Sequence, residues 1–198
     1  MNVYDLIAEH YSELFPLESE KLDFIQQICP LPGRLCDAGC ATGDLAEGLQ
    51  RRGYTVYGLD LNAKMIGIAE RKAAELRTSG KLTFYHADIA DILQFGSCNG
   101  VLCFGNTLPH LPDEAALRRF FSAVYQSVQA HGIVIVEVLN YDRILAEKKM
   151  DFKDKETDAF IFTRRYDFLP DGNIRFTITF TDKRRNTVTS DFTVLHPL

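Results

Sequence analysis

The chain lacks several features that would place it in a specialised class of protein. Its longest apolar run, residues 133–136, is far shorter than the roughly 20 residues that a membrane-spanning helix needs. No basic cluster precedes an apolar stretch at the N-terminus, so no signal peptide is expected. Basic residues are outnumbered, 22 against 27, which argues against a protein that mainly binds phosphate backbones. We therefore predict a cytoplasmic protein that binds neither membranes nor nucleic acid.

The cysteines show neither a metal-binding pattern nor a disulfide framework. The chain has five, without a Cys-x-x-Cys pair, and Cys36 and Cys40 have no clustered partners at zinc spacing. In a cytoplasmic protein they are most simply interpreted as reduced thiols. We expect no metal site and no disulfide.

Glycine is almost absent from the end of the chain: 12 of the 13 glycines lie before Asn140 and only Gly172 lies beyond it. The glycine-rich part contains five short β-rich runs, at residues 34–38, 55–60, 82–87, 100–104 and 132–139. Helical periodicity separates them, and one predicted helix begins at Asp113 and ends at Gly132. Largely apolar strands joined by amphipathic helices are typical of a parallel sheet that is covered on both faces.

The two ends of the chain differ from this pattern. At the start, residues 3–15 and 19–29 are expected to form two helices split by Pro16. At the end, residues 174–181 alternate strictly between apolar and polar, with β-rich runs at 160–169 and 187–196 on either side. We therefore predict an α/β protein with a doubly wound, mostly parallel sheet and an antiparallel extension of three strands.

The first predicted strand runs into a glycine loop, Asp-Ala-Gly-Cys-Ala-Thr-Gly-Asp, at residues 37–44. Open parallel sheets bind ligands beyond the carboxyl ends of their strands, and Gly39 and Gly43 let the backbone approach a ligand closely. Their spacing differs from the Gly-x-Gly-x-x-Gly of dinucleotide enzymes. Asp37 and Asp44 would repel a pyrophosphate, so a cofactor with a positively charged sulfonium is favoured over a nicotinamide dinucleotide.

Further acidic residues end the next two strands. Asp60 can accept hydrogen bonds from both hydroxyls of a ribose, or alternatively cap the helix that begins near Asn62. Leu61 and Met65 can pack on an adenine ring or belong to the ordinary core. Asp88 can accept from the adenine amino group or cap a helix.

These segments, in their order along the chain, resemble the successive motifs of class I S-adenosylmethionine-dependent methyltransferases. The resemblance rests on residues 37–43, on Asp60 and on His86-Ala87-Asp88, and it covers the first 140 residues. Family members usually carry glycine where this chain has Ala41. The resemblance implies a Rossmann-like sheet of seven strands and S-adenosyl-L-methionine as co-substrate. The predicted cofactor-binding residues are Tyr11, Asp37, Gly39, Cys40, Ala41, Thr42, Gly43, Asp60, Leu61, Met65, Asp88, Ile89 and Asn106.

Three other segments narrow the resemblance to small-molecule N-methyltransferases of the glycine and sarcosine type. Residues 104–111 resemble the loop after the fourth strand in that group, residues 3–11 are similar to its lid helix, and residues 140–145 extend the match. The resemblance implies a small-molecule methyl acceptor.

Several side chains in these segments are open to two interpretations. His110 is the predicted catalytic residue that orients or deprotonates the acceptor, although a single loop histidine is alternatively structural. Tyr4 and Tyr11 contact the ligands or simply hold their helix to the core. On the extension, Arg164, Arg165 and Arg175 attract a substrate carboxylate or are merely solvated.

The resulting organisation has three parts: lid helices at residues 1–32, the cofactor-binding domain at 33–148, and the substrate-side extension at 149–198. No residues remain for the antiparallel pair that normally completes the family's sheet, which leads us to expect a truncated chain. Alternatively, two strands of the extension replace that pair. Other functions left open are a nicotinamide-dependent oxidoreductase and a non-catalytic module that binds an adenosyl ligand. Homo-oligomerisation is possible.

Overall fold

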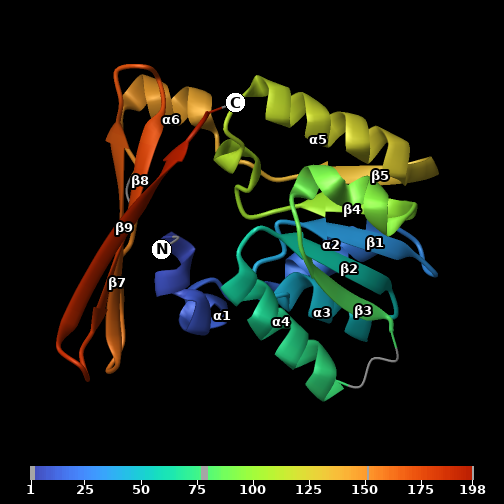
Figure 1. The fold of residues 1–198 in the computed structure, drawn as a ribbon, viewed down its shortest axis with the longest axis horizontal. Helices are drawn as coiled ribbons and strands as arrows, with labels where there is room; N and C mark the ends of the chain where they lie inside the picture. The colour runs from blue at the N-terminus through green and yellow to red at the C-terminus, as the bar shows by residue number, and fades with distance from the viewer. Residues whose placement is uncertain (1–2, 77–79, 151, 198) are drawn as a thin grey trace.

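The protein folds around two separate β-sheets, and the smaller one lies beyond the strand ends of the larger one, with the N-terminal segment between them (Figure 1). The computed structural model describes residues 3–76, 80–150 and 152–197. Within these residues no helix is long and apolar enough to cross a bilayer.

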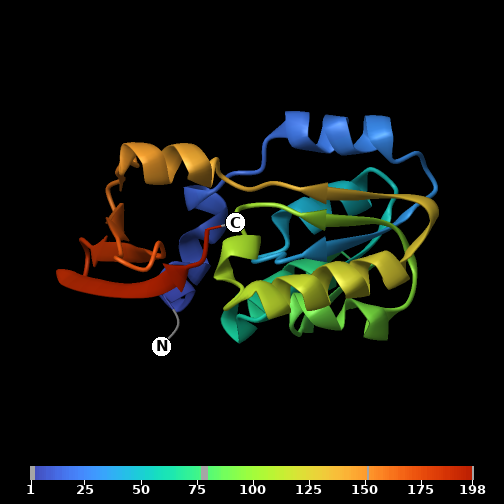
Figure 2. The same ribbon diagram turned by 90° about the horizontal axis from the view of Figure 1, so that it is seen from above.

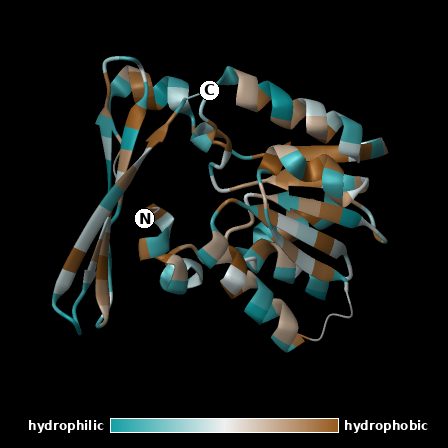
Figure 3. Ribbon diagram, in the orientation of Figure 1, coloured by the Kyte–Doolittle hydropathy of each residue, from teal (hydrophilic) through white to brown (hydrophobic). Residues whose placement is uncertain are grey.

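The larger sheet has five parallel strands in the order β3-β2-β1-β4-β5, which confirms the predicted α/β class. The strands are β1 (Arg34–Ala38), β2 (Thr55–Asp60), β3 (Leu82–His86), β4 (Cys98–Cys103) and β5 (Val128–Val136). They are largely apolar, and β4 and β5 are mostly brown in the hydropathy colouring of Figure 3. Such strands need cover on both faces.

Helices provide that cover from two sides for the central strands β1, β2 and β4, whereas the edge strands β3 and β5 keep exposed residues. The helices are α2 (Ser19–Ile28), α3 (Asp44–Arg51), α4 (Ala63–Leu76), η3 (Ile89–Phe95) and α5 (Glu114–Ser127). One buried cluster joins the sheet to η3 and α5, and a second joins its opposite face to α2, α3 and α4. Figure 2 shows α2 and α5 on opposite sides of the sheet.

The smaller sheet is antiparallel and contains four strands rather than the predicted three. They are β6 (Lys155–Glu156), β7 (Phe160–Phe168), β8 (Ile174–Asp182) and β9 (Thr187–Leu195). The additional strand, β6, is only two residues long, too short for its alternation to be detected in the sequence. Helix α6 (Tyr141–Glu147) leads from the larger sheet toward this one.

Neither sheet extends the other. Among the described residues, the strand order of the larger sheet ends at β5, and β7 to β9 pair only within the smaller sheet. The alternative in which two strands of the extension complete the parallel sheet is therefore wrong. The expectation of a truncated chain stays a prediction.

The predicted helix over residues 3–15 is also wrong. The segment instead forms two 3₁₀ turns, η1 (Val3–Leu6) and η2 (Ala8–His10), and a single α-helical turn, α1 (Tyr11–Leu14). The Lys64 ammonium donates to the Asp5 carbonyl, an acceptor that a continuous helix would use internally. Packing between two sheets thus overrides the local helical pattern.

Gly132 does not end a helix as predicted. Helix α5 ends at Ser127, and β5 begins with the next residue, Val128. A methyl group at Gly132 would lie 2.7 Å from the Asn99 carbonyl oxygen, so this glycine permits a close approach of backbone at the irregular start of the β4–β5 pair.

Candidate functional site

Two adjoining cavities lie beyond the carboxyl ends of the parallel strands. The smaller has a volume of about 250 Å³, and the larger has a volume of about 880 Å³ and extends to the antiparallel sheet. Residues that line both cavities are Tyr4, Tyr11, Gly39, Ala41, Gly105 and His110. Two ligands that occupied these cavities would therefore meet at His110 and the glycine loop.

The loop after β1 adopts the backbone conformation for which its glycines are needed. Gly39 has φ +83°, and a methyl group there would lie 2.4 Å from Thr107 Oγ1. Gly43 has φ +79° and packs against Phe84. Ala41 also has a positive φ, 47°, although it carries a side chain. The loop therefore exposes backbone to the cavities at the cost of strain at one residue.

Asp60 fixes this loop to the end of β2. Its Oδ2 accepts from the Ala41 amide at 2.9 Å, and its Oδ1 accepts from the Asn62 amide at 2.8 Å. Burial raises the pKa of Asp60, while these two hydrogen bonds oppose the shift. The cap of α4 is the Asn62 side chain, which accepts from the Met65 amide, so Asp60 does not cap that helix. Asp60 lines the smaller cavity.

Asp37 is a buried carboxylate without a full set of partners. It is 2% exposed, and its Oδ2 has no hydrogen-bond partner among the described residues. Burial, and then the charge of Asp60, raise the pKa of Asp37 to about 7. Because it lines the larger cavity, a cationic ligand group placed there would favour the charged form of Asp37, as the nearby Lys21 already does in part.

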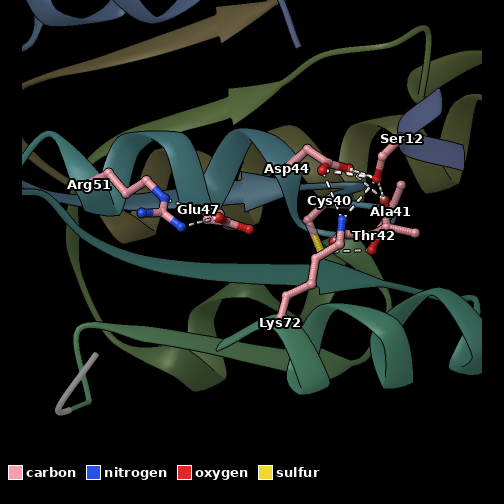
Figure 4. A network of polar contacts seen from close by, with 8 residues as sticks. All are labelled: Ser12, Cys40, Ala41, Thr42, Asp44, Glu47, Arg51 and Lys72. Atoms are coloured by element: carbon pink, nitrogen blue, oxygen red, sulfur yellow. Dashed lines mark hydrogen bonds and ion pairs between the residues drawn. The ribbon is translucent and has the colours of Figure 1, made fainter. Parts of the chain in front are cut away.

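Asp44, the second acidic residue of the loop, is already compensated. Its carboxylate accepts from Lys72 Nζ at 2.8 Å, from the Thr42 hydroxyl at 2.6 Å and from the Ser12 hydroxyl at 2.8 Å. Figure 4 shows these groups converging between α1, α3 and α4. Of the two acids that flank the loop, Asp37 is thus the one with an unsatisfied oxygen.

His110 and Tyr4 form a neutral pair in the wall between the cavities. The Tyr4 hydroxyl and His110 Nε2 share a hydrogen bond of 3.0 Å. Burial, with a contribution from His196, lowers the pKa of His110 to about 4, and burial raises the pKa of Tyr4. The imidazole is therefore uncharged at neutral pH, as a proton acceptor must be.

Most of the predicted site residues come together around the cavities. Those that line at least one of them are Tyr11, Asp37, Gly39, Cys40, Ala41, Asp60, Leu61, Met65, Ile89, Asn106 and His110. Thr42, Gly43 and Asp88 line neither. Asp88 caps η3 by accepting from the Ala90 amide at 2.8 Å, the alternative considered for it above.

The three arginines of the extension are placed very differently. Arg164 lines the larger cavity, whereas Arg165 is exposed and forms an ion pair with Asp167. Arg175 stacks over the ring of Phe192.

The structure adds residues that sequence reasoning missed. The Tyr141 hydroxyl accepts a hydrogen bond of 2.7 Å from the Asn106 side-chain amide. Tyr166, on β7, lines the larger cavity. Thr107 packs against Gly39. Thr107 and Tyr141 belong to the segments 104–111 and 140–145 that carry the resemblance, although neither was singled out. Tyr166 has no local signal, because only the folded extension brings it to the cavity.

Among the described residues, no group of three or more histidine, cysteine, aspartate or glutamate side chains could hold a metal ion. The five cysteines are free and buried.

A parallel sheet with a glycine loop after β1 and a carboxylate at the end of β2 defines a nucleoside-binding α/β domain. Comparison with known families makes this specific. Residues 35–132 match the family model described as "Methyltransferase domain", so over these residues the chain belongs to that family, and its fold is the class I methyltransferase fold.

Known proteins agree with this assignment. The ubiquinone biosynthesis O-methyltransferase of Ralstonia nicotianae is 28% identical over 139 residues, 64% of this chain and 58% of that protein. The chain spans 42%, 58% and 64% of the length of three curated relatives that it matches.

Two solved structures share the fold over nearly the whole chain. An S-adenosylmethionine-dependent methyltransferase from Clostridium acetobutylicum has a TM-score of 0.77 at 20% identity and covers 98% of this chain and 80% of its own. The sugar N-methyltransferase KedS8 from Streptoalloteichus sp. has a TM-score of 0.73 at 20% identity, with 99% and 79% covered. At these identities the likeness concerns the fold, including the antiparallel extension.

Proposed function

We propose that the protein transfers a methyl group from S-adenosyl-L-methionine to a small-molecule acceptor by direct in-line displacement. The observation that carries the proposal is the placement of Asp37, a buried carboxylate with an unsatisfied oxygen, next to the glycine loop and Asp60. Such a site suits a nucleoside that also bears positive charge. Relatives named as O-methyltransferases and an N-methyltransferase of the same fold support it.

The residues present fit the parts of this cofactor. Asp60 uses one lone pair of each oxygen on a backbone amide, so each oxygen retains capacity for a ribose hydroxyl. Leu61, Met65 and Ile89 line the smaller cavity and provide apolar surface for an adenine ring. Asp37 is placed to pair with an ammonium group.

When bound, the sulfonium cofactor supplies an activated methyl electrophile. The chain's own residues must then position the acceptor and exclude water. His110, uncharged and in the wall shared by both cavities, would take a proton of the acceptor at Nδ1, in the tautomer whose Nε2–H donates to the Tyr4 hydroxyl. The acceptor would occupy the larger cavity.

Binding is tested by thermal denaturation with S-adenosylhomocysteine. We expect the ligand to raise the melting temperature of the wild-type chain, and Asp60→Ala to abolish most of that shift. Asp158→Ala, at an exposed position that lines neither cavity, is the matched control and should retain it. NADH in place of the adenosyl ligand should produce no shift, and a shift with NADH alone would favour the oxidoreductase.

Catalysis is tested separately with a panel of amines and alcohols. We expect methyl transfer to at least one acceptor, and a rate reduced by about 10²-fold or more in His110→Ala. Binding of S-adenosylhomocysteine without transfer to any acceptor would favour a non-catalytic module. Cytoplasmic location, homo-oligomerisation, the absence of nucleic-acid binding and the three-part division of the chain remain predictions from the sequence.

A further inference from the structure

Arg164, on β7, is one of the residues that line the larger cavity. Its Nε is buried and has no hydrogen-bond partner among the described residues. The guanidinium lies 4.6 Å from the ring centre of Phe152, 5.4 Å from that of Phe162 and 5.5 Å from that of Phe15. These rings shield the charge from water, which strengthens any ion pair formed there.

The charges around this cavity are segregated except for Lys21, which lies on the acidic side and is paired with Glu137. The wall formed by residues 153–164 contributes only positive groups, from Lys153, Lys155 and Arg164. The Lys155 ammonium is already bound to the Leu14 carbonyl. The wall at the parallel sheet includes the acidic Asp37. The cavity therefore presents a negative group where a cationic cofactor is proposed and a positive group at the opposite wall.

The groups near Arg164 compensate its charge only in part. Asp154, Tyr166 and Tyr4 all favour the charged form, yet the effect of burial is larger and lowers the pKa of Arg164. Asp154 is exposed to solvent. Among the described residues, the Nε of Arg164 has no hydrogen-bond partner, and the planar donors of a guanidinium are shaped to bind an oxyanion.

We propose that the methyl acceptor carries an oxyanion, a carboxylate or a phosphate, that binds to Arg164. This inference rests on the proposed function, because it assigns the larger cavity to the acceptor. The acceptor would lie between the guanidinium and His110, with its anionic end at β7 and its nucleophile toward the parallel sheet. The surrounding aromatic side chains favour an acceptor with apolar or aromatic surface next to the anion.

The test compares matched pairs of small molecules by calorimetry, with S-adenosylhomocysteine present. The probes are 4-hydroxybenzoate against 4-hydroxybenzamide, and phenyl phosphate against phenol. We expect the anionic member of at least one pair to bind about tenfold more tightly than the neutral one, and Arg164→Gln to remove that preference. Arg165→Gln, the exposed neighbour, is the control and should leave it unchanged.

The outcomes separate this inference from the proposed function. The shift with S-adenosylhomocysteine should persist in Arg164→Gln, which also establishes that the variant is folded. If Arg164→Gln does not fold, Arg164→Lys replaces it and should weaken binding of the anion, because an ammonium lacks the planar fork. Equal affinity for the anionic and the neutral member in both pairs, no binding of either anion, or an equal loss in Arg165→Gln would overturn the inference. Failure of the wild type to bind the adenosyl ligand would contradict the proposed function instead.

Discussion

Ala41 carries a side chain at a position whose backbone favours glycine. Its φ of 47° lies in the left-handed region, which costs an L-residue with a Cβ about 1 kcal/mol or more. We expect Ala41→Gly to stabilise the fold by up to about 1 kcal/mol, the gain being reduced by the greater freedom of glycine in the unfolded chain. Urea denaturation measures the change. Ala74→Gly, on the exposed side of α4, should instead lose about 1 kcal/mol. Loss of stability in both variants would contradict the account of strain at Ala41.

Asp37 should make stability fall as the pH rises. Its pKa is about 7 in the folded protein, above the ordinary value of 3.8, so the folded state keeps a proton that the unfolded chain loses between these pH values. The free energy of unfolding therefore decreases across this window, by up to about 4 kcal/mol from this residue. Asp37→Asn should remove that part of the pH dependence in urea denaturation and be more stable than wild type at about pH 8.

The control for this effect is Asp44→Asn. Because Asp44 is paired with Lys72, its substitution should lower stability at neutral pH rather than raise it. His110 acts in the opposite direction to Asp37, since its lowered pKa makes stability rise with pH between about 4 and its ordinary 6.5. The difference between the pH profiles of wild type and Asp37→Asn reports on Asp37 alone, because both proteins retain His110. A pH profile of stability that is unchanged in Asp37→Asn would contradict the raised pKa of Asp37.

At the scale of elements, the sequence predicts best where one local pattern decides the structure. The first two strands occupy the predicted residues, because their apolar runs are bounded by turn residues and buried on both faces. The segment before Pro16 was predicted as a helix and is not one, since contacts such as that of Lys64 with Asp5 come from another element. The glycine loop and Asp60 were identified from the order of motifs. Tyr166 could not be, because only the folded chain brings it to the cavity.

The polar network at the start of α3 holds the N-terminal segment against α3 and α4. Lys72 donates to Asp44, to the Ser12 hydroxyl and to the Thr42 carbonyl, with less than a third of each charged side chain exposed (Figure 4). We expect Lys72→Met to destabilise the fold by about 1–2 kcal/mol, because it leaves the Asp44 charge uncompensated. Chemical denaturation measures this. The control is Arg71→Met, at the residue before Lys72, which breaks only the exposed ion pair with Glu9 and should have no measurable effect on stability. Equal losses of stability in the two variants would contradict a stabilising role for Lys72.

At the scale of the whole molecule, residues 3–14 lie between the two sheets and pack on the antiparallel sheet and on α4 (Figure 1). Their buried cluster includes Met65 from the cofactor domain and Phe162 from the extension, and Tyr4 and Tyr11 line both cavities. Whatever fills the cavities must therefore contact this segment. The segment is built of short turns, which open more readily than a continuous helix.

This arrangement predicts that a cofactor analogue stabilises the N-terminal segment as well as the glycine loop. In hydrogen-exchange measurements, we expect S-adenosylhomocysteine to slow exchange of amides in residues 3–14 and 39–43 by about tenfold or more at saturation. Amides toward the C-terminal end of α2, which packs on the sheet through Ile25, should change little and provide the internal control. Protection confined to residues 39–43 would mean that ligand binding and ordering of the N-terminal segment are independent. Protection of both, with none in α2, would identify the segment as part of the binding site that links the two sheets.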